Sequence, residues 1–209
     1  MKHKLSDICS FANDRVLVAN LELNNYISTE NMLPNKEGIT QSKKLPNISQ
    51  TQAYQVGDVL ISNIRPYFRK IWFADREGGC SNDVLVLRAN QQTNPGFLFY
   101  LLSDDDFFDY ATATAKGTKM PRGDKNAIMQ YEVPDLPFEV QRRIVKTLSA
   151  IDAKITLNRK INHNLSGSMS DTENSPDIRR GRRVSRMAIR REFSIRLIRT
   201  CSKNGAVAV

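Results

Sequence analysis

A segment near the C-terminal end constrains the fold more than any other stretch of the chain. Within residues 137–165 no glycine occurs, and no proline follows Pro137. Apolar residues recur there at steps of three and four, which is the period of one face of an α-helix. Pro137 suits a first helical turn, where its missing N–H removes no hydrogen bond, and Glu139 suits the positive end of the helix. The apolar face comprises Val140, Ile144, Leu148, Ile151 and Ile155, and it continues through Asn158, Asn162 and Leu165.

Two arrangements of this helix are compatible with the pattern. An amphipathic helix can lie on its own domain, with its apolar face turned inward. Alternatively, it can pack lengthwise against a second helix. Asparagines in an apolar seam lower stability but can fix register and partner number, so they favour a partner helix. The residues predicted to form this interface are Ile144, Leu148, Ile151, Ile155, Asn158 and Asn162.

The residues before this helix predict a domain of mixed α/β (α+β) class around a small sheet. Residues 23–55 are polar and rich in turn formers, so we expect mostly loop with short extended pieces. Three β-rich runs follow, at 59–64, 71–74 and 83–88, with a turn at 75–79 between the second and the third. Short connections between such runs favour antiparallel pairing.

Helical signals dominate the next part of the chain. Asn94-Pro95 opens one predicted helix, and Ser103 before three aspartates is the predicted cap of a second. Asp124 is the predicted cap of a short third helix, and residues 131–134 read as a closing strand. The aspartates at 104, 105, 106 and 109 resemble metal ligands, but acidic residues are also favoured at a helix start, which is the simpler interpretation.

The last 44 residues differ in character from the rest. They hold 10 of the 31 Lys and Arg but 4 of the 22 Asp and Glu, so six of the nine excess positive charges lie there. A basic arm for nucleic acid is one reading, and non-native sequence after a shifted reading frame is another. The predicted organisation is therefore a domain over 1–135, a spacer or dimerisation helix over 136–165, and a basic tail, disordered or non-native, over 166–209.

Composition argues against several classes of protein. Cys9, Cys80 and Cys201 show neither metal-site spacing nor a disulfide framework, which favours a reducing, cytoplasmic setting. No apolar run has the length of a membrane span, and no signal core begins the chain. With only His3 and His163 available, a histidine triad or a zinc site is poorly served. We therefore expect neither an enzyme nor a metal protein.

Basic residues with an interleaved tyrosine gather in predicted loops of the domain. Arg and Lys pair with phosphates and base edges, and tyrosine packs on sugars or bases, so these loops predict DNA contact. For any single residue, a solvated turn is the competing interpretation. The candidate DNA-binding residues are Lys43, Lys44, Arg65, Tyr67, Arg69, Lys70, Lys119 and Arg122, with Lys116 and Lys125 flanking the last two.

Three stretches together resemble the specificity subunit of type I restriction–modification systems. They are GDVLISNIRPYFRK, CSNDVLVLR and GTKMPRGDKNAIMQYEVPDLPFEVQRRIVKTLSAIDAKITLNRKIN, and the resemblance covers roughly residues 4–165. It implies a target-recognition domain that grips double-stranded DNA, followed by a helix that forms a coiled coil. In such a subunit two modules alternate, methyltransferase subunits dock on the assembly, and a motor–nuclease subunit adds ATP-dependent cleavage.

This chain departs from that pattern in holding one recognition domain and in losing the helical seam after Leu165. The resemblance implies a non-catalytic recognition module without a cofactor of its own, because S-adenosylmethionine, Mg and ATP would belong to partner subunits. It further implies DNA and methyltransferase subunits as partners, with the motor–nuclease subunit and a second copy of the chain as additional candidates, and no membrane. The alternative is a truncated remnant, or an assembly or inhibitory fragment that binds methyltransferase subunits without specific DNA binding.

Overall fold

The computed structural model describes residues 2–167, and the predicted basic tail lies outside the described residues apart from its first two. The chain divides into two compact units, Met1–Phe138 and a second that begins at Glu139. The strands are β1 (Lys2–Lys4), β2 (Cys9–Phe11), β3 (Arg15–Leu17), β4 (Tyr26–Ile27), β5 (Gln50–Tyr54), β6 (Val59–Ser62), β7 (Ile71–Phe73), β8 (Gly78–Cys80), β9 (Val84–Ala89) and β10 (Glu132–Pro134). The helices are α1 (Leu5–Ile8), α2 (Pro95–Leu102), α3 (Asp105–Ala113), α4 (Lys125–Met129) and α5 (Phe138–Gly167), with 3-10 turns η1 (Val18–Asn20) and η2 (Pro66–Phe68).

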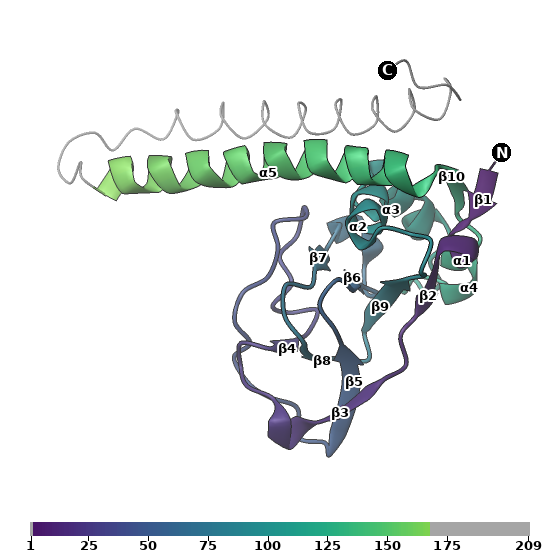
Figure 1. The fold of residues 1–209 in the computed structure, drawn as a ribbon. Helices are drawn as coiled ribbons and strands as arrows, with labels where there is room; N and C mark the ends of the chain where they lie inside the picture. The colour runs from purple at the N-terminus through teal and green to yellow at the C-terminus, as the bar shows by residue number, and fades with distance from the viewer. Residues whose placement is uncertain (1, 168–209) are drawn as a thin grey trace. The chain divides into compact units, whose positions relative to one another are not determined.

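The strands of the first unit form three sheets rather than one (Figure 1). The order β2-β9-β6-β7 is antiparallel throughout, and it contains all three strands predicted from the β-rich runs. The second four-stranded sheet, β3-β5-β8-β4, is antiparallel except where β4 pairs with β8. The pair β1-β10 joins the two ends of the domain. The predicted mixed α/β class is confirmed.

The core lies between the two four-stranded sheets. Tyr54 of β5 and Cys80 of β8 join Leu60 of β6, Trp72 of β7 and Val86 of β9 in one buried cluster. Neighbouring side chains on a strand point to opposite faces, so the intervening apolar residues of β6 and β9 face the other way, where α2 packs on β6, β7 and β9. Both faces of this sheet are therefore covered, which explains why its central strands carry continuous apolar runs.

Strand β8 corrects the turn predicted for residues 75–79. Gly78 and Gly79 read as a turn in the sequence, but they lie inside a sheet between β5 and β4. A Cβ on Gly78 would lie 2.1 Å from the Asn25 carbonyl oxygen, and one on Gly79 would lie 2.5 Å from a methyl of Leu21. These glycines permit close approach of neighbouring chain rather than a reversal of direction.

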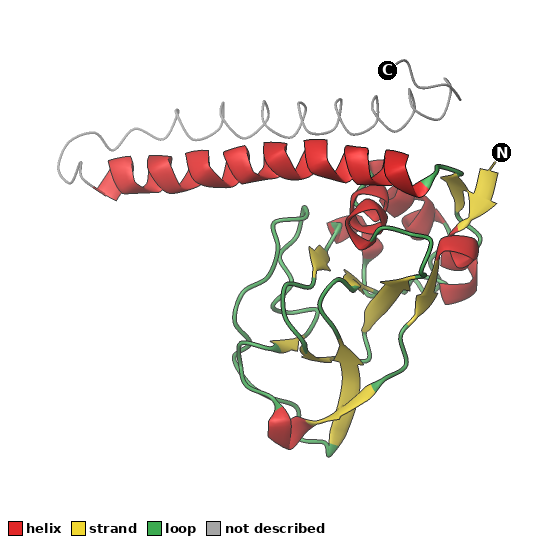
Figure 2. Ribbon diagram, viewed as in Figure 1, coloured by secondary structure: helices red, strands yellow, loops and turns green. Residues whose placement is uncertain are grey.

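The helix starts agree with the predictions in two cases and differ in one. The Asn94 side chain accepts from the N–H groups of Gly96 and Phe97, and Asp124 caps α4 in the same manner. The cap of α3 is Asp104 rather than Ser103, which instead donates its hydroxyl to the Phe99 carbonyl of α2. Residues 28–49 form mostly loops (Figure 2), as expected from their composition.

Candidate nucleic-acid interface

The two basic loops predicted to contact DNA lie side by side. One connects β6 to β7 through η2, and the other connects α3 to α4. The Arg65 N–H donates to the Pro121 carbonyl over 2.8 Å, and the Gly123 N–H donates to the Asn63 carbonyl over 3.0 Å. Segments more than fifty positions apart thus share one framework. We call residues 63–70 and 116–123 together the basic surface.

The turn η2 is held in an uncommon backbone conformation. Arg65 and Arg69, which flank it, have φ of 51° and 53°, in the left-handed region that side-chain-bearing residues seldom adopt. Each such residue costs on the order of 1–3 kcal/mol and persists only where its surroundings impose it. Here Pro66 starts the turn, and the Arg69 N–H closes it on the Pro66 carbonyl at 2.8 Å.

Arg69 is bound to α3. Its Nη1 lies 3.0 Å from Asp105 Oδ1 and its Nη2 lies 3.1 Å from Asp109 Oδ1. Lys36 Nζ reaches the same Asp105 oxygen at 2.6 Å. The aspartates that resembled metal ligands are therefore a helix cap and partners of basic side chains. Among the described residues, no group of three or more His, Cys, Asp or Glu is placed to hold a metal ion.

Lys70 is also engaged within the domain. Its Nζ donates to the Thr29 carbonyl at 2.6 Å and lies 5.8 Å from the centre of the Phe68 ring. Burial, which disfavours the charged form, lowers the pKa of Lys70 below its ordinary value. This lysine fastens the loop after Ser28 to the basic surface.

The basic side chains of the second loop are exposed. Lys119 is exposed, and Arg122 is exposed with its Nη2 3.1 Å from Asp83 Oδ1. Lys116 pairs with Asp124, and that contact is the first cause of the lowered pKa of Asp124, ahead of the backbone N–H groups that it caps. These cations are available to solvent in a way that Arg69 is not.

Lys43 and Lys44 lie on a third segment, beside a cavity of about 330 Å³. Both are exposed. Asp83 lines the same cavity and binds Arg122, and its carbonyl accepts from the Asn63 N–H at 2.8 Å. The structure thereby brings Lys43 and Lys44 close to the edge of the basic surface.

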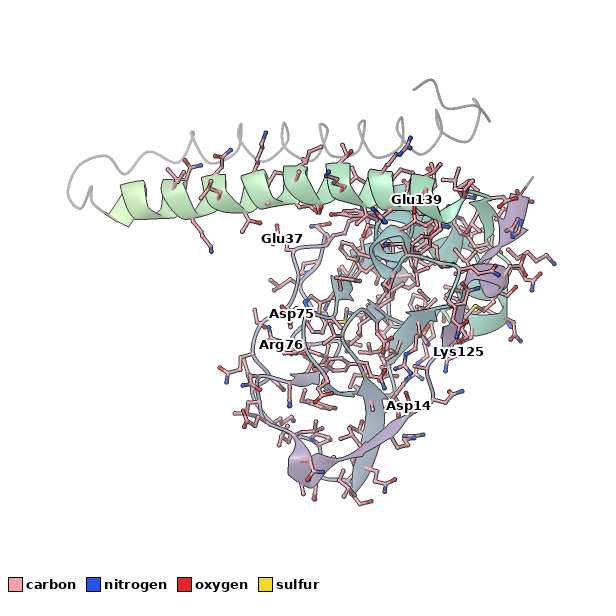
Figure 3. The ribbon with its side chains drawn as sticks, in the orientation of Figure 1. Asp14, Glu37, Asp75, Arg76, Lys125 and Glu139 are labelled. Carbon is pink, nitrogen blue, oxygen red and sulfur yellow. The ribbon has the colours of Figure 1, made fainter. Side chains whose placement is uncertain are left out.

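Other basic residues of the domain have mainly structural contacts. Lys125, at the start of α4, places its Nζ 5.7 Å from the centre of the Phe11 ring (Figure 3). Arg76 pairs with the adjacent Asp75 through Nε at 2.6 Å, and both labels lie together in Figure 3. Arg88 forms two hydrogen bonds of 2.8 Å to buried Asp58, one to each carboxylate oxygen.

Two residues of the basic surface, Asn63 and Phe68, and one residue that connects its loops, Asp83, were missed by sequence reasoning. Asn63 has its side-chain Oδ1 buried without a hydrogen-bond partner among the described residues, and Arg65 Nε is in the same condition. Phe68 is exposed beside Tyr67. Asp83 connects the loops. Asn63 and Phe68 lie at the end of the first predicted strand and in the basic loop that follows it, and that position could have identified them. Nothing in the sequence distinguished Asp83.

Helix α5 extends two residues beyond the predicted end and is 30 residues long. Along its predicted seam, Ile144 and Leu148 are buried, Ile151 and Ile155 are half-buried, and Asn158 and Asn162 are exposed. Leu157 and Ile161, which the seam did not include, are large exposed apolar side chains one turn apart.

The two described cysteines are not poised as nucleophiles. Cys9 and Cys80 are free and buried, and burial raises the pKa of each thiol to about 12, so both stay protonated at neutral pH. Within residues 2–167, no helix is long and apolar enough to span a membrane.

The family comparison accounts for most of the chain. The model of the type I restriction modification DNA specificity domain matches residues 1–166. The chain belongs to this family. As a specificity domain it is a recognition component and not a catalyst, which agrees with the expectation from sequence.

Two curated specificity subunits are similar to this specificity domain. The EcoDI specificity subunit of Escherichia coli is 26% identical over 131 residues, covering 62% of this chain and 27% of its own length. The HindI specificity subunit of Haemophilus influenzae is 30% identical over 151 residues, covering 67% and 32% respectively. The chain thus spans about a third or less of the curated relatives that it matches.

Solved structures show the same fold. The HsdS subunit from Thermoanaerobacter tengcongensis superposes with a TM-score of 0.61 at 23% identity, covering 80% of this chain and 46% of that one. The type I restriction–modification S subunit from M. genitalium gives 0.52 at 16% identity, covering 78% and 44%. The predicted architecture, a small-sheet recognition domain followed by a long helix, is confirmed, and it corresponds to somewhat less than half of these two solved chains.

Proposed function

We propose that this specificity domain binds double-stranded DNA through the basic surface and associates with other subunits through α5. The observation that carries the first half is the pair of backbone hydrogen bonds between Arg65 and Pro121 and between Gly123 and Asn63. They join two loops that were each weakly basic into a single surface. Membership in a family of DNA specificity domains supports the same conclusion.

The residues predicted to bind DNA divide into two groups. Arg65, Lys119 and Arg122 face the duplex, and Lys43 and Lys44 extend the contact along the neighbouring segment. Arg and Lys at such positions neutralise phosphates and supply register, and tyrosine packs on sugar or base. Arg69 and Lys70 act differently, because their polar atoms bind Asp105, Asp109 and the Thr29 carbonyl. They position Tyr67 and its neighbours rather than contact phosphate.

The second half of the proposal concerns partners of α5. The half-buried Ile151 and Ile155 and the exposed Asn158 lie on the predicted seam, and Leu157 and Ile161 add further exposed apolar surface. A methyltransferase subunit or the matching helix of a second copy covers this surface in the assembly. S-adenosylmethionine, Mg²⁺ and ATP belong to the methyltransferase and motor–nuclease subunits.

Salt titration of a labelled duplex tests the DNA half. The full chain should bind with an affinity that falls steeply with salt, because released counterions drive phosphate-led association. A Lys119→Ala/Arg122→Ala variant keeps the Arg-rich tail, so any loss of affinity and slope reports on the loop of residues 116–123. Equal slopes for variant and parent would remove the loop of residues 116–123 from the interface. Methyltransferase binding without salt-sensitive DNA binding would favour the assembly-fragment alternative.

The helix half is tested separately by Ile151→Lys, which places a charge in the proposed interface. The variant should no longer co-purify with a methyltransferase subunit from the same genome, and any dimer seen by sedimentation should dissociate. Lys154→Ala, at an exposed position of the same helix, is the matched control. Retained co-purification of the Ile151 variant would exclude this seam.

A further inference from the structure

Two adjacent aromatic side chains of the η2 turn, within the basic surface, are exposed to solvent. Tyr67 is 47% exposed and Phe68 is 39% exposed, and their ring centres lie 4.8 Å apart. By contrast, Tyr54, Phe97, Phe107 and Phe108 are almost completely buried. A pair of exposed rings on a charged surface has an energetic cost in water, which suggests an occupant for them.

The backbone that carries these rings has an uncommon conformation that several hydrogen bonds hold in place. Within the described residues, the four non-glycine residues with positive φ are Asn35, Lys36, Arg65 and Arg69. All four meet at this one turn, because the Asn35 N–H donates to the Phe68 carbonyl at 2.8 Å and the Lys36 N–H donates to the Arg69 carbonyl at 2.9 Å. Strained backbone concentrates at functional sites, where it presents a side chain in a set position.

Unpaired polar atoms lie at the base of the same turn. The buried Asn63 Oδ1 and Arg65 Nε have no hydrogen-bond partner among the described residues. Gly123 leaves room for Asn63, since a Cβ there would lie 3.0 Å from Asn63 Oδ1. Both polar atoms are buried beneath the turn, so their unmet hydrogen bonds add to the energetic cost that is held there.

We propose that the turn from Arg65 to Arg69 is a preformed aromatic wedge that enters the DNA stack and unstacks one base step. Tyr67 and Phe68 are inserted, and Arg69 is a positioning residue that holds the turn on α3. Recognition then includes the deformability of the target step in addition to its hydrogen-bonding groups. This inference rests on the proposed DNA binding.

The surroundings favour DNA over a protein surface as the occupant. Arg65 flanks the rings, and its N–H binds Pro121, which brings the exposed Lys119 and Met120 to the same site. Apolar wedges such as methionine and phenylalanine insert between base steps in many architectural proteins, with basic residues on the adjoining phosphates. The basic surface supplies both kinds of side chain in one place.

The ratio of the affinities for two duplexes tests the wedge. The full chain is titrated with a labelled 30-base-pair duplex of mixed sequence and with the same duplex carrying a central T·T mismatch. A mismatched step is already partly unstacked, so the chain should bind it roughly tenfold more tightly. Tyr67→Ala/Phe68→Ala should reduce this ratio to about twofold or less, whereas Tyr67→Leu/Phe68→Leu should retain it because leucine also inserts.

The control variant is Leu17→Ala/Ile48→Ala, which removes side chains that are 48% and 51% exposed elsewhere on the domain. It should leave the ratio unchanged. Equal binding of both duplexes by the parent, or an undiminished ratio in the alanine pair, overturns the wedge while leaving salt-sensitive DNA binding intact. Loss of the ratio in the leucine pair would indicate ring stacking without insertion, and would also overturn it.

Two results distinguish a failure of the wedge from a failure of the proposed DNA-binding function. Absence of salt-sensitive binding to either duplex defeats the proposed DNA-binding function itself. If the alanine pair keeps the mismatch ratio but fails to co-purify with the methyltransferase subunit, the rings belong to a protein interface and the wedge is excluded.

Discussion

The two loops of the basic surface have similar composition but bind different things. In the loop around η2, Arg69 binds two carboxylates and Lys70 binds a backbone carbonyl, so these cations maintain the fold. In the loop before α4, Lys119 and Arg122 are both exposed, although Arg122 Nη2 also lies 3.1 Å from Asp83 Oδ1. The same residue types therefore stabilise the fold in the loop around η2 and are exposed in the loop before α4. Burial and partner, rather than residue type, decide which role a basic side chain takes.

The largest effect that follows from this difference is on stability. Arg69→Ala should lower the free energy of unfolding by about 2 kcal/mol, because buried Asp105 loses one charged partner and Asp109 loses its own. Arg69→Lys should recover only part, since one ammonium cannot form the same fork of contacts. Urea unfolding provides the measurement. Lys119→Ala, the control from the other loop, should stay within about 0.5 kcal/mol of the parent. An unchanged midpoint for Arg69→Ala would abolish the distinction between the loops.

A smaller effect is expected on DNA binding, with the roles reversed. Lys119→Ala and Arg122→Ala should each reduce the slope of log affinity against log salt by about 0.9, because each removes roughly one phosphate contact. Their melting temperatures should match that of the parent, since neither side chain is buried. Lys70→Gln serves as the comparison, because its ammonium already binds the Thr29 carbonyl. A slope change for Lys70→Gln as large as those of the exposed residues would show that both loops contact phosphate.

Local patterns predicted the elements whose stability is local or whose faces are simply apolar. The helical period placed α5, side-chain caps placed α2 and α4, and β-rich runs placed β6, β7 and β9. Strand β8 was missed because its glycines look like a turn until the neighbouring Asn25 carbonyl and Leu21 methyl are known. No sequence pattern expresses that kind of crowding.

The site shows the same limit in another form. Sequence reasoning identified both basic loops, yet it treated Arg65, Arg69 and Lys119 as equivalent. Arg69 pairs with a residue 40 positions away, and Arg88 binds Asp58 from 30 positions away. Such pairings depend on how the sheets and helices are assembled, so composition within a loop cannot reveal which cations are already engaged.

The smallest predicted effect concerns Lys116, the basic residue of the second loop that pairs with the cap of α4. Its ion pair with Asp124 is the leading cause of that carboxyl's lowered pKa, and the N–H groups of Asn126 and Ala127 contribute the rest. Lys116→Ala should therefore raise the pKa of Asp124 toward its ordinary value without reaching it, because the helix cap remains. A carboxyl with a depressed folded-state pKa stabilises the fold above its ordinary pKa, and this contribution disappears as pH falls through the depressed value. The variant should accordingly lose less stability on acidification than the parent does.

An NMR titration of the side-chain carboxyl carbons measures the shift in the pKa of Asp124, with Lys119→Ala as the control that leaves it unchanged. If Asp124 titrates identically in parent and Lys116→Ala, the lysine is as free as Lys119, and the second loop contacts the domain through its backbone and Arg122 alone.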